Sequence, residues 1–355
     1  MSRHGDGTTR PHDTLRKIIG PFAAPLYGAV VARRNRRFDR GIGVKRVPVP
    51  VVSVGNLTVG GTGKTPFVMW LCRELVARRI SPAIAMRGYK SELSSGRSDE
   101  AEEYRAALPG VPVIVNPDRH AGITGFIAGG GRADVVVLDD GFQHRQLHRD
   151  LDVVLVDAQA GTPDDRLLPA GDLREPVRNI ARAGIVVLTH ADNAAETGRV
   201  ERELGLFLRS GVVVARSTHR WTDIAVSDAG NELSWRVQAL RGKHVVVVCG
   251  IARPYGFLRS LDETGCRVQR VFGLRDHEPL SEAFAERIFA TAVATRSQIV
   301  VTTQKDFARF GGVPPAWSKL TVVRPRLSLE VQPSEAVLTR VTEAITSAKA
   351  APPPA

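Results

Sequence analysis

Short apolar runs rich in β-branched residues alternate with helical stretches along most of this chain. The runs with the length and composition of buried strands are 51–54, 83–86, 111–115, 134–138, 151–156, 185–189 and 212–215. Helical stretches such as 99–107 separate them. This alternation predicts right-handed βαβ crossovers and a mostly parallel sheet with helices on both faces. Ligands of such sheets bind at the carboxyl ends of the strands, so we expect the chemistry there.

A polar stretch around 218–235 interrupts the alternation. After it, apolar runs at 245–249, 267–271 and 299–303 begin a second α/β series. The pattern predicts a boundary near residue 230. The predicted segments are a disordered tail at 1–13, an N-terminal helix at 14–40, a larger domain at 41–230, a smaller α/β domain at 231–346 and a disordered tail at 347–355.

The N-terminal segment 14–40 combines an uncharged stretch with a basic cluster. Residues 18–32 carry no charge, but glycines and prolines interrupt them, and about 18 or more apolar residues would be needed to span a bilayer. The arginines that follow are Arg33, Arg34, Arg36, Arg37 and Arg40. Such a cluster suits anionic lipid headgroups, so we expect an amphipathic helix associated with a membrane surface. Two alternatives are a cleaved signal peptide, against which the arginines argue, and an ordinary helix packed on the domain.

The net charge indicates the kind of partner the protein binds, and the cysteine content indicates its compartment. A formal net charge of +12 and a pI of about 10.2 favour an anionic partner, which could be nucleic acid, a nucleotide or an acidic membrane surface. Cys72, Cys249 and Cys266 have no metal or redox spacing. A scattered set of this kind indicates a reducing compartment, and hence the cytoplasm.

The segment 55–66 reads GNLTVGGTGKTP and joins the predicted strand 51–54 to a helical pattern. Its glycines lack the Cβ atoms that would keep the backbone away from a ligand, so successive N–H groups can face phosphate oxygens at a helix N-terminus. Lys64 would reach the β- and γ-phosphates, and Thr65 a Mg²⁺ ion. The usual spacing GxxxxGK[ST] has glycine where this chain has Thr58. The context predicts a P-loop NTPase-like fold.

Two adjacent carboxylates, Asp139 and Asp140, end the apolar run 134–138. An acid at the carboxyl end of a strand can reach the Mg²⁺ of a bound nucleotide. Adjacent residues of an extended backbone point to opposite faces, so one acid can face the metal while the other orients a ligand or water. Gln143 and His144 follow at the same sheet edge. The alternative is a plain Asp-Asp-Gly turn.

An acidic cluster at 98–103 stands out in this basic chain. Its simplest interpretation is a helix N-terminus, where acids complement the helix dipole. A carboxylate near a triphosphate could also accept the proton of an attacking hydroxyl. Both interpretations can hold together. A second charged loop at 275–278 lies in the smaller domain, and spacing alone does not connect it to Asp99.

Taken together, these blocks resemble the tetraacyldisaccharide 4'-kinase family, and they run in order over roughly residues 14 to 310. The matching pieces are VSVGNLTVGGTGKTP at 52–66, RGY at 87–89, SDE at 98–100, DDGFQH at 139–144, RD at 149–150, PAGDLREP at 169–176, CGIARP at 249–254, DH at 276–277 and KD at 305–306. Thr58 in the glycine loop matches the family's own form. Departures such as Met86, Ser98 and Asp172 lie outside the phosphate loop and the acids at 139–140.

The resemblance implies an ATP-dependent kinase of lipid A biosynthesis that phosphorylates the 4'-hydroxyl of a tetraacyl disaccharide 1-phosphate. It implies ATP and Mg²⁺ as cofactors, an acylated disaccharide phosphate lipid as substrate and an anionic membrane surface as partner. The location implied is the cytoplasmic face of an inner membrane. No nucleic acid and no protein partner are implied, and we expect a monomer.

The family's functional positions fall on the following residues of this chain. The phosphate loop would be Thr58, Val59, Gly60, Gly61, Thr62, Gly63, Lys64 and Thr65. The metal would be held by Thr65, Asp139, Asp140 and Glu100. Catalysis would rest on Lys64 and on a dyad of Asp99 and His277 that takes the hydroxyl proton. Positions near nucleotide or lipid would be Tyr89, Arg119, Gln143, His144, Arg174 and Glu175. An acid in one domain and a histidine in the other would make domain closure part of catalysis.

Two other classes of function remain as alternatives. A P-loop GTPase or ATPase switch, or a metallochaperone-type protein, would carry an [NT]KxD motif for reading the base. The nearest candidate, THAD at 189–192, has histidine in place of lysine. A nucleic-acid-dependent ATPase would explain the basic charge and predicts salt-sensitive binding to DNA or RNA.

Overall fold

The structure is a computed structural model, and it describes residues 11–88, 99–160, 166–228, 231–250, 255–274 and 280–350, with the backbone alone at 11–19, 99 and 255. The chain divides into two compact units. Unit 1 consists of Met1–Thr218 and Val331–Ala355, and unit 2 of His219–Glu330.

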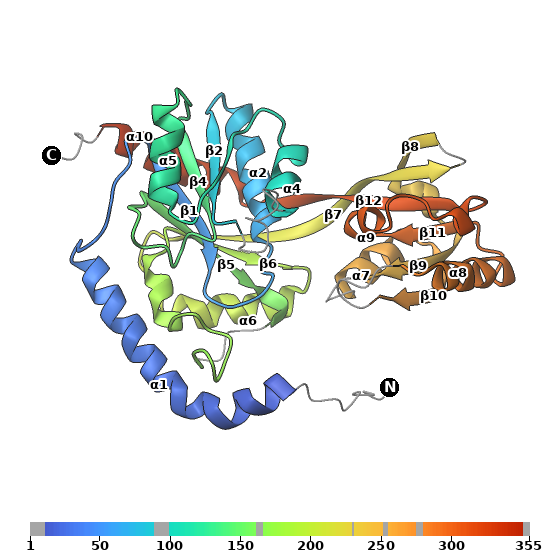
Figure 1. Cartoon of the computed structure of the whole chain (residues 1–355), viewed down its shortest axis with the longest axis horizontal. Helices are drawn as coiled ribbons and strands as arrows, with labels where there is room; N and C mark the ends of the chain where they lie inside the picture. The colour runs from blue at the N-terminus through green and yellow to red at the C-terminus, as the bar shows by residue number, and fades with distance from the viewer. Residues whose placement is uncertain are drawn as a thin grey trace. The chain divides into compact units, whose positions relative to one another are not determined.

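Unit 1 contains a parallel sheet with the strand order β7-β6-β5-β1-β4-β2-β3 (Figure 1). Its strands are β1 (Val51–Asn56), β2 (Pro82–Met86), β3 (Val113–Val115), β4 (Val135–Asp139), β5 (Leu151–Asp157), β6 (Ile185–Thr189) and the start of β7 (Val213–Asp228). Every residue of β1, β2, β4, β5 and β6 is buried. Because side chains alternate between the two faces of a strand, this burial shows that both faces are covered. The predicted α/β fold with a mostly parallel sheet is confirmed.

The covering helices of unit 1 follow the strands in the chain. They are α2 (Lys64–Ala77), α4 (Asp99–Ala107), α5 (Arg119–Ala128), α6 (Ala194–Gly205) and α10 (Ser334–Ala350), with short 3-10 helices η1 (Ala158–Ala160) and η2 (Val177–Arg182). Asp118 caps α5 by accepting a hydrogen bond from the amide of Ala121, and Asn193 caps α6 in the same way. These caps satisfy amides that a helix leaves without intrahelical partners.

The strands of unit 2 have the order β10-β9-β11-β12-β7-β8. Its elements are β8 (Asn231–Arg236), β9 (His244–Cys249), β10 (Arg267–Gly273), β11 (Ile299–Thr302), β12 (Thr321–Gln332), α7 (Tyr255–Glu263), α8 (Glu282–Ala294) and α9 (Gln304–Arg309), with short 3-10 helices η3 (Val237–Leu240) and η4 (Pro315–Trp317). Along β9, Val245 and Val247 belong to one core cluster while Val246 and Val248 belong to another. The central strand is therefore covered on both faces, as expected of a second α/β unit.

The division between the units differs from the predicted boundary near residue 230. Strand β7 does not end near Ala215 but continues to Asp228 and forms an antiparallel hairpin with β8. Most residues of β8 are exposed, and its sequence shows no apolar run. The chain accordingly enters unit 2 within β7, at residue 219.

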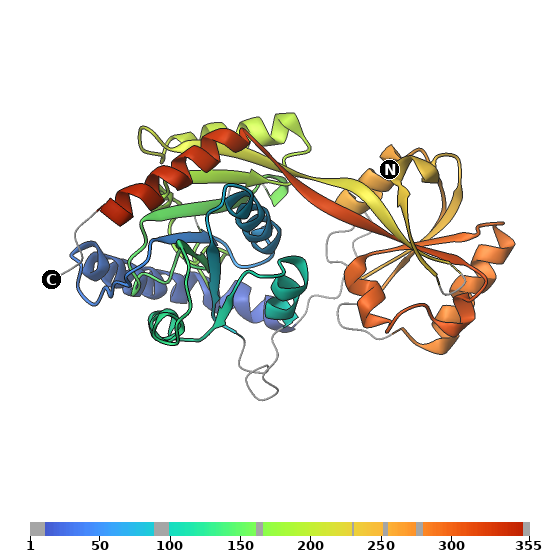
Figure 2. The same cartoon turned by 90° about the horizontal axis from the view of Figure 1, so that it is seen from above.

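The C-terminal part of the chain also belongs to a different unit from the one that its sequence pattern predicts. Residues from Val331 onward belong to unit 1 rather than to the smaller domain, and Figure 2 shows α10 beside the strands of unit 1. Buried Val337 and Val341 fix one face of α10. Residues 347–350, predicted to be disordered, form its last turn, and residues 11–13 are helical as well. Residues 1–10 and 351–355 lie outside the described part of the chain.

The N-terminal helix α1 (Pro11–Asp39) is longer than predicted and runs along the outside of unit 1 in Figure 1. It continues through Pro21 and Pro25. Within the described residues, no helix is long and apolar enough to cross a membrane. Helix α1 has an exposed face with Phe22, Leu26 and Val30. Its other face is turned toward the rest of unit 1.

Candidate functional site

The glycine loop connects β1 to α2 as the sequence predicts. Gly63, at the N-cap of α2, has a φ of 76°, a conformation that glycine adopts without strain. Within the part of the chain that the structure describes, no side chain caps this helix, and its first turn contains no acid. The hydroxyl of Thr62 is buried and has no hydrogen-bond partner among the described residues. An uncapped helix N-terminus preceded by glycines is suited to bind an anion.

Backbone hydrogen bonds tie the first half of the phosphate loop to the segment 172–174. Thr58 forms an isolated antiparallel bridge with Leu173. The amide of Val59 donates to the carbonyl of Asp172 over 2.8 Å, and the amide of Arg174 donates to the carbonyl of Leu57 over 2.8 Å. The loop is therefore held by a segment that lies more than a hundred residues later in the chain.

Lys64 is the first residue of α2 and lies between two oxygen atoms. Its Nζ donates to Asn56 Oδ1 over 3.4 Å and lies 3.6 Å from Asp140 Oδ1. The parallel register of β1 and β4 brings these partners together, because it places Val54 opposite Asp139. The ammonium group is thus fixed at the carboxyl edge of the sheet, beside the open helix N-terminus.

Asp139, Glu100 and Thr65 surround the hydroxyl of Tyr104. The Tyr104 hydroxyl donates to Asp139 Oδ2 over 3.1 Å and also interacts with the Thr65 side chain. Burial, reinforced by the charge of Glu100, raises the pKa of Asp139 to about 6. A buried carboxylate with a second carboxylate nearby is costly to ionise, and a bound cation would stabilise the ionised forms of both.

The donor set at this place fits Mg²⁺ better than a transition metal. In the described residues, no group of three or more His, Cys, Asp or Glu side chains is arranged to hold a metal. Mg²⁺ at nucleotide sites needs only one or two carboxylates, because phosphates and water supply its other oxygen ligands. Thr65, Asp139 and Glu100 fit that requirement.

Asp140 lies in a different environment from Asp139. Arg174 Nη1 donates to both carboxylate oxygens of Asp140, over 2.9 and 2.8 Å. Although burial opposes it, the charges of Lys64 and Arg174 hold the pKa of Asp140 below its usual value. Asp140 has a φ of 49°, which is uncommon for a residue other than glycine. The structure pairs Asp140 with cationic side chains, whereas the sequence placed it among the metal ligands.

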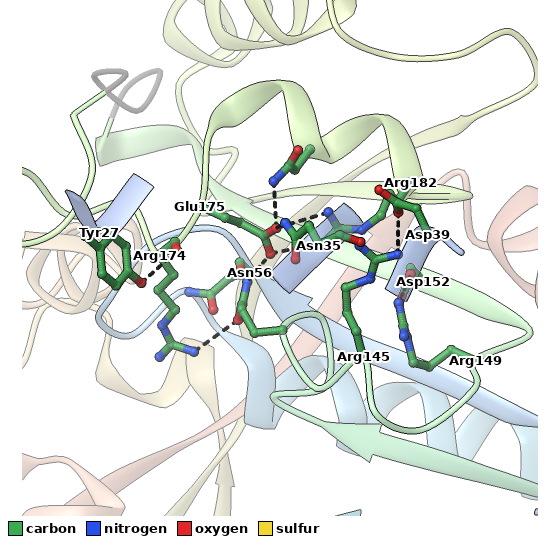
Figure 3. Close-up of polar contacts among 12 residues, drawn as sticks. Tyr27, Asn35, Asp39, Asn56, Arg145, Arg149, Asp152, Arg174, Glu175 and Arg182 are labelled. Atoms are coloured by element: carbon green, nitrogen blue, oxygen red, sulfur yellow. Dashed lines mark hydrogen bonds and ion pairs between the residues drawn. The ribbon is translucent and has the colours of Figure 1, made fainter. Parts of the chain in front are cut away.

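Glu175 lies in a hydrogen-bond network with Asn35 and Arg182 behind the loop (Figure 3). Gln143 Nε2 donates to the carbonyl of Asn56 over 2.8 Å and to Glu175 Oε1 over 2.9 Å. The Glu175 side chain is fully buried, and Arg182 forms an ion pair with it over 3.0 Å. Despite burial, Arg182 holds the pKa of Glu175 below its usual value. Glu175 therefore supports the loop, and its burial argues against the predicted contact with substrate.

His144 lines a basic cavity, and the charge of Arg119 acts on its imidazole. Burial and the neighbouring charges of Arg119 and Arg149 lower the pKa of His144 to about 4, so its imidazole is neutral at physiological pH. The Nε of Arg119 is buried without a hydrogen-bond partner among the described residues. A cavity of about 410 Å³ is lined by Arg34, Arg37, Phe38, Ile42, Gly43, Lys45, Asp118, His120, His144 and Gln146. Its cationic lining suits an anionic group.

Some of the predicted site lies outside the described residues. Tyr89 and His277 are not described, and for Asp99 only the backbone is described, as the first residue of α4. Four supporting residues were not predicted: Asn35, Asn56, Tyr104 and Arg182. Asn56 stands inside the quoted loop motif, and Tyr104 lies one helical turn after Glu100. Those spacings could have identified both, whereas nothing local indicates Asn35.

Comparison with known proteins gives a consistent result. The family model described as tetraacyldisaccharide-1-P 4'-kinase matches residues 15–345. The chain is 36% identical to tetraacyldisaccharide 4'-kinase of Anaeromyxobacter dehalogenans over 85% of this chain and 84% of that protein. It is 37% identical to the Chlorobaculum parvum protein of the same name, over 82% and 84% respectively.

A solved structure shares the fold over most of the length. It is LpxK from Aquifex aeolicus in complex with ATP, which is 28% identical with a TM-score of 0.69 and covers 93% of this chain and 99% of its own. The family expected from the sequence motifs is confirmed by these matches. The uncapped phosphate loop and its flanking acids thus lie in a chain that belongs to the tetraacyldisaccharide-1-phosphate 4'-kinase family.

Proposed function

We propose that this chain transfers the γ-phosphoryl group of ATP to the 4'-hydroxyl of a tetraacyl disaccharide 1-phosphate in lipid A biosynthesis. The observation that carries the proposal is the meeting of Lys64, Asp139 and Asp140 at the open N-terminus of α2, in a chain of this family. Related proteins carry that activity in their names, and the Aquifex protein binds ATP.

Positioning and charge neutralisation are what phosphoryl transfer requires of the protein. The amides of the loop would hold the triphosphate, with the ammonium of Lys64 against its terminal phosphates. Thr65, Asp139 and Glu100 would hold Mg²⁺, which neutralises phosphate charge when it is bound. Asp140 keeps Lys64 and Arg174 oriented toward the same place.

The acceptor side of the site rests on fewer described residues. Asp99 and His277 are proposed to take the proton of the attacking hydroxyl, since the family resemblance assigns them that role. Arg119 and His144 are proposed to face the sugar phosphate, because His144 lines the basic cavity and the charge of Arg119 acts on its imidazole. A neutral imidazole at His144 can donate one hydrogen bond and accept another.

The proposed activity has a direct test. The purified chain, incubated with ATP, Mg²⁺ and a tetraacyl disaccharide 1-phosphate, is expected to yield a lipid one phosphate heavier by mass spectrometry. An acceptor that already carries a 4'-phosphate serves as the matched control and is expected to gain nothing. ATP consumption that is independent of the acceptor, with no heavier lipid, would contradict the proposal.

We also propose that α1 binds this enzyme to the surface of an anionic membrane. Phe22, Leu26 and Val30 are 84, 71 and 59% exposed, and their spacing of four residues places them on one side of the helix. The arginines that follow provide charge for anionic headgroups. An exposed apolar stripe next to basic residues is typical of helices that lie in the membrane interface.

Replacing Phe22, Leu26 and Val30 together by serine is expected to lower partitioning onto anionic vesicles at least ~10-fold. Each substitution removes apolar surface that the bound helix would bury in the membrane interface. The measurement is co-sedimentation with the vesicles. Leu206 is also 84% exposed but lies at the C-terminus of α6, so Leu206→Ser is the matched control and is expected to sediment like the wild type. Equal loss in both proteins would refute the role of α1.

A further inference from the structure

Helix α1 packs closely against the segment that holds the phosphate loop. A Cβ atom at Gly20 would lie 2.8 Å from Ala170 Cα, and one at Gly28 would lie 2.9 Å from Leu167 Cδ1. At Gly20 the neighbour is backbone, so a larger residue there would force the helix and Ala170 apart. Since the same segment continues into the residues that pair with the phosphate loop, α1 and the loop share one support.

Two side chains of α1 extend this packing to the end of the segment (Figure 3). The hydroxyl of Tyr27 donates to the carbonyl of Arg174 over 2.8 Å. Asn35 Nδ2 donates to Glu175 Oε2 over 3.1 Å. The first contact fixes the backbone of Arg174, whose side chain is paired with Asp140.

From Glu175 the hydrogen bonds continue to the phosphate loop. Gln143 Nε2 bridges Glu175 Oε1 and the carbonyl of Asn56. The Asn56 side chain in turn donates to the carbonyl of Thr58 and accepts from Lys64. Both contacts from α1 therefore lead, within a few hydrogen bonds, to groups that would surround the triphosphate.

The side chain of Glu175 is held in one conformation by its burial and its hydrogen bonds. Its side chain is fully buried, and donors from Asn35, Gln143, Asn179 and Arg182 point at its two oxygens. A buried carboxylate that loses one donor retains a desolvated oxygen, so the network favours a single arrangement. A shift of α1 would change the set of donors and with it the position of Gln143.

We propose that Glu175 is a positioning residue that couples the seating of α1 to the geometry of the phosphate loop, so that binding of α1 to a lipid surface tightens ATP binding. The surface part of this inference rests on the proposed membrane role of α1. Because coupling between two binding events is reciprocal, ATP strengthens vesicle binding by the same factor. The device would let the kinase hold ATP firmly only where its lipid acceptor is present.

The test compares two asparagines that donate to the same oxygen of Glu175. Asn35 reaches Oε2 from α1 over 3.1 Å, and Asn179 reaches it from η2 over 2.8 Å. Asn35→Ala and Asn179→Ala each remove one donor, but only Asn35→Ala removes the contact of α1 with Glu175. The affinity of the full-length protein for a fluorescent ATP analogue is measured with and without mixed phosphatidylethanolamine and phosphatidylglycerol vesicles.

We expect vesicles to tighten nucleotide binding about fivefold or more in the wild type and in Asn179→Ala, and to have little effect on Asn35→Ala. An absent vesicle effect in the wild type, or equal responses of the two variants, would overturn the coupling. If Asn35→Ala does not fold, Tyr27→Phe decides, since it removes only the hydroxyl that contacts Arg174. Nucleotide binding needs no phosphate transfer, so this result stands apart from the proposed kinase activity.

Discussion

Replacing Lys64 by alanine is expected to lower the rate of phosphate transfer by ~10²–10³-fold, because a preorganised charged donor at a water-excluded site is worth about that much. The Lys64 side chain is only 16% exposed, and its Nζ is fixed between Asn56 and Asp140. The position of the charge is therefore set before ATP arrives. Steady-state kinetics with saturating ATP should show that kcat falls more than the KM for the acceptor changes.

A second lysine of unit 1 provides the control for this loss. Lys349 pairs with Asp134 over 2.6 Å on the surface, remote in sequence from the loop. Lys349→Ala is expected to transfer phosphate at close to the wild-type rate. Turnover near wild type in Lys64→Ala itself would contradict the assignment of the site. Circular dichroism of both variants separates lost chemistry from lost folding.

The carboxyl edge of the sheet could be predicted because its signals are local. The buried run of β4 ends in Asp139, and the glycine loop follows β1 directly. The parallel register of two adjacent strands then brings the acid beside the loop without further information. This is why the sequence predicts that Lys64, Thr65 and Asp139 lie at the same edge of the sheet.

The partner of the second acid could not be predicted in the same way. Asp140 is paired with Arg174, which lies 34 residues later in the chain. Glu175 meets Asn35 across 140 residues. Contacts at these separations depend on how α1 and the segment 167–175 pack, and no spacing rule in the sequence encodes that packing. Burial of Glu175, and hence its supporting role, follows from the same contacts.

The misplaced boundary has a comparable cause. Prediction of strands relied on longer apolar runs, whereas the second half of β7 has only the short buried apolar run 224–226 and most residues of β8 are exposed. A hairpin whose outer strand faces solvent needs few apolar side chains. The polar pattern of 218–235 therefore indicated a break in the alternation, where the structure has two paired strands.

Asp139→Asn is expected to lower phosphate transfer at least ~10²-fold, because an amide is a weak ligand for Mg²⁺ and does not neutralise its charge. Asp134 lies just before the opposite, amino end of β4, so Asp134→Asn is the matched control and should retain activity. If excess Mg²⁺ restored Asp139→Asn to the wild-type rate, the acid would only tune metal affinity. An unchanged rate without added metal would remove Asp139 from the site.

The same substitution is expected to leave the protein without bound metal at least as stable as the wild type at neutral pH. The pKa of Asp139 is about 6 in the folded protein, above its ordinary value of 3.8, because burial and the charge of Glu100 disfavour its ionised form. The stabilisation from protonated Asp139 is thus complete below about pH 4 and is lost as the pH rises through about 6.

Asparagine stays neutral throughout, and its amide can donate to the Tyr104 hydroxyl. Thermal denaturation between pH 4 and 8 should therefore show a melting temperature less dependent on pH in Asp139→Asn than in the wild type. A variant that lost activity and melted far below the wild type at every pH would instead show that Asp139 acts through folding.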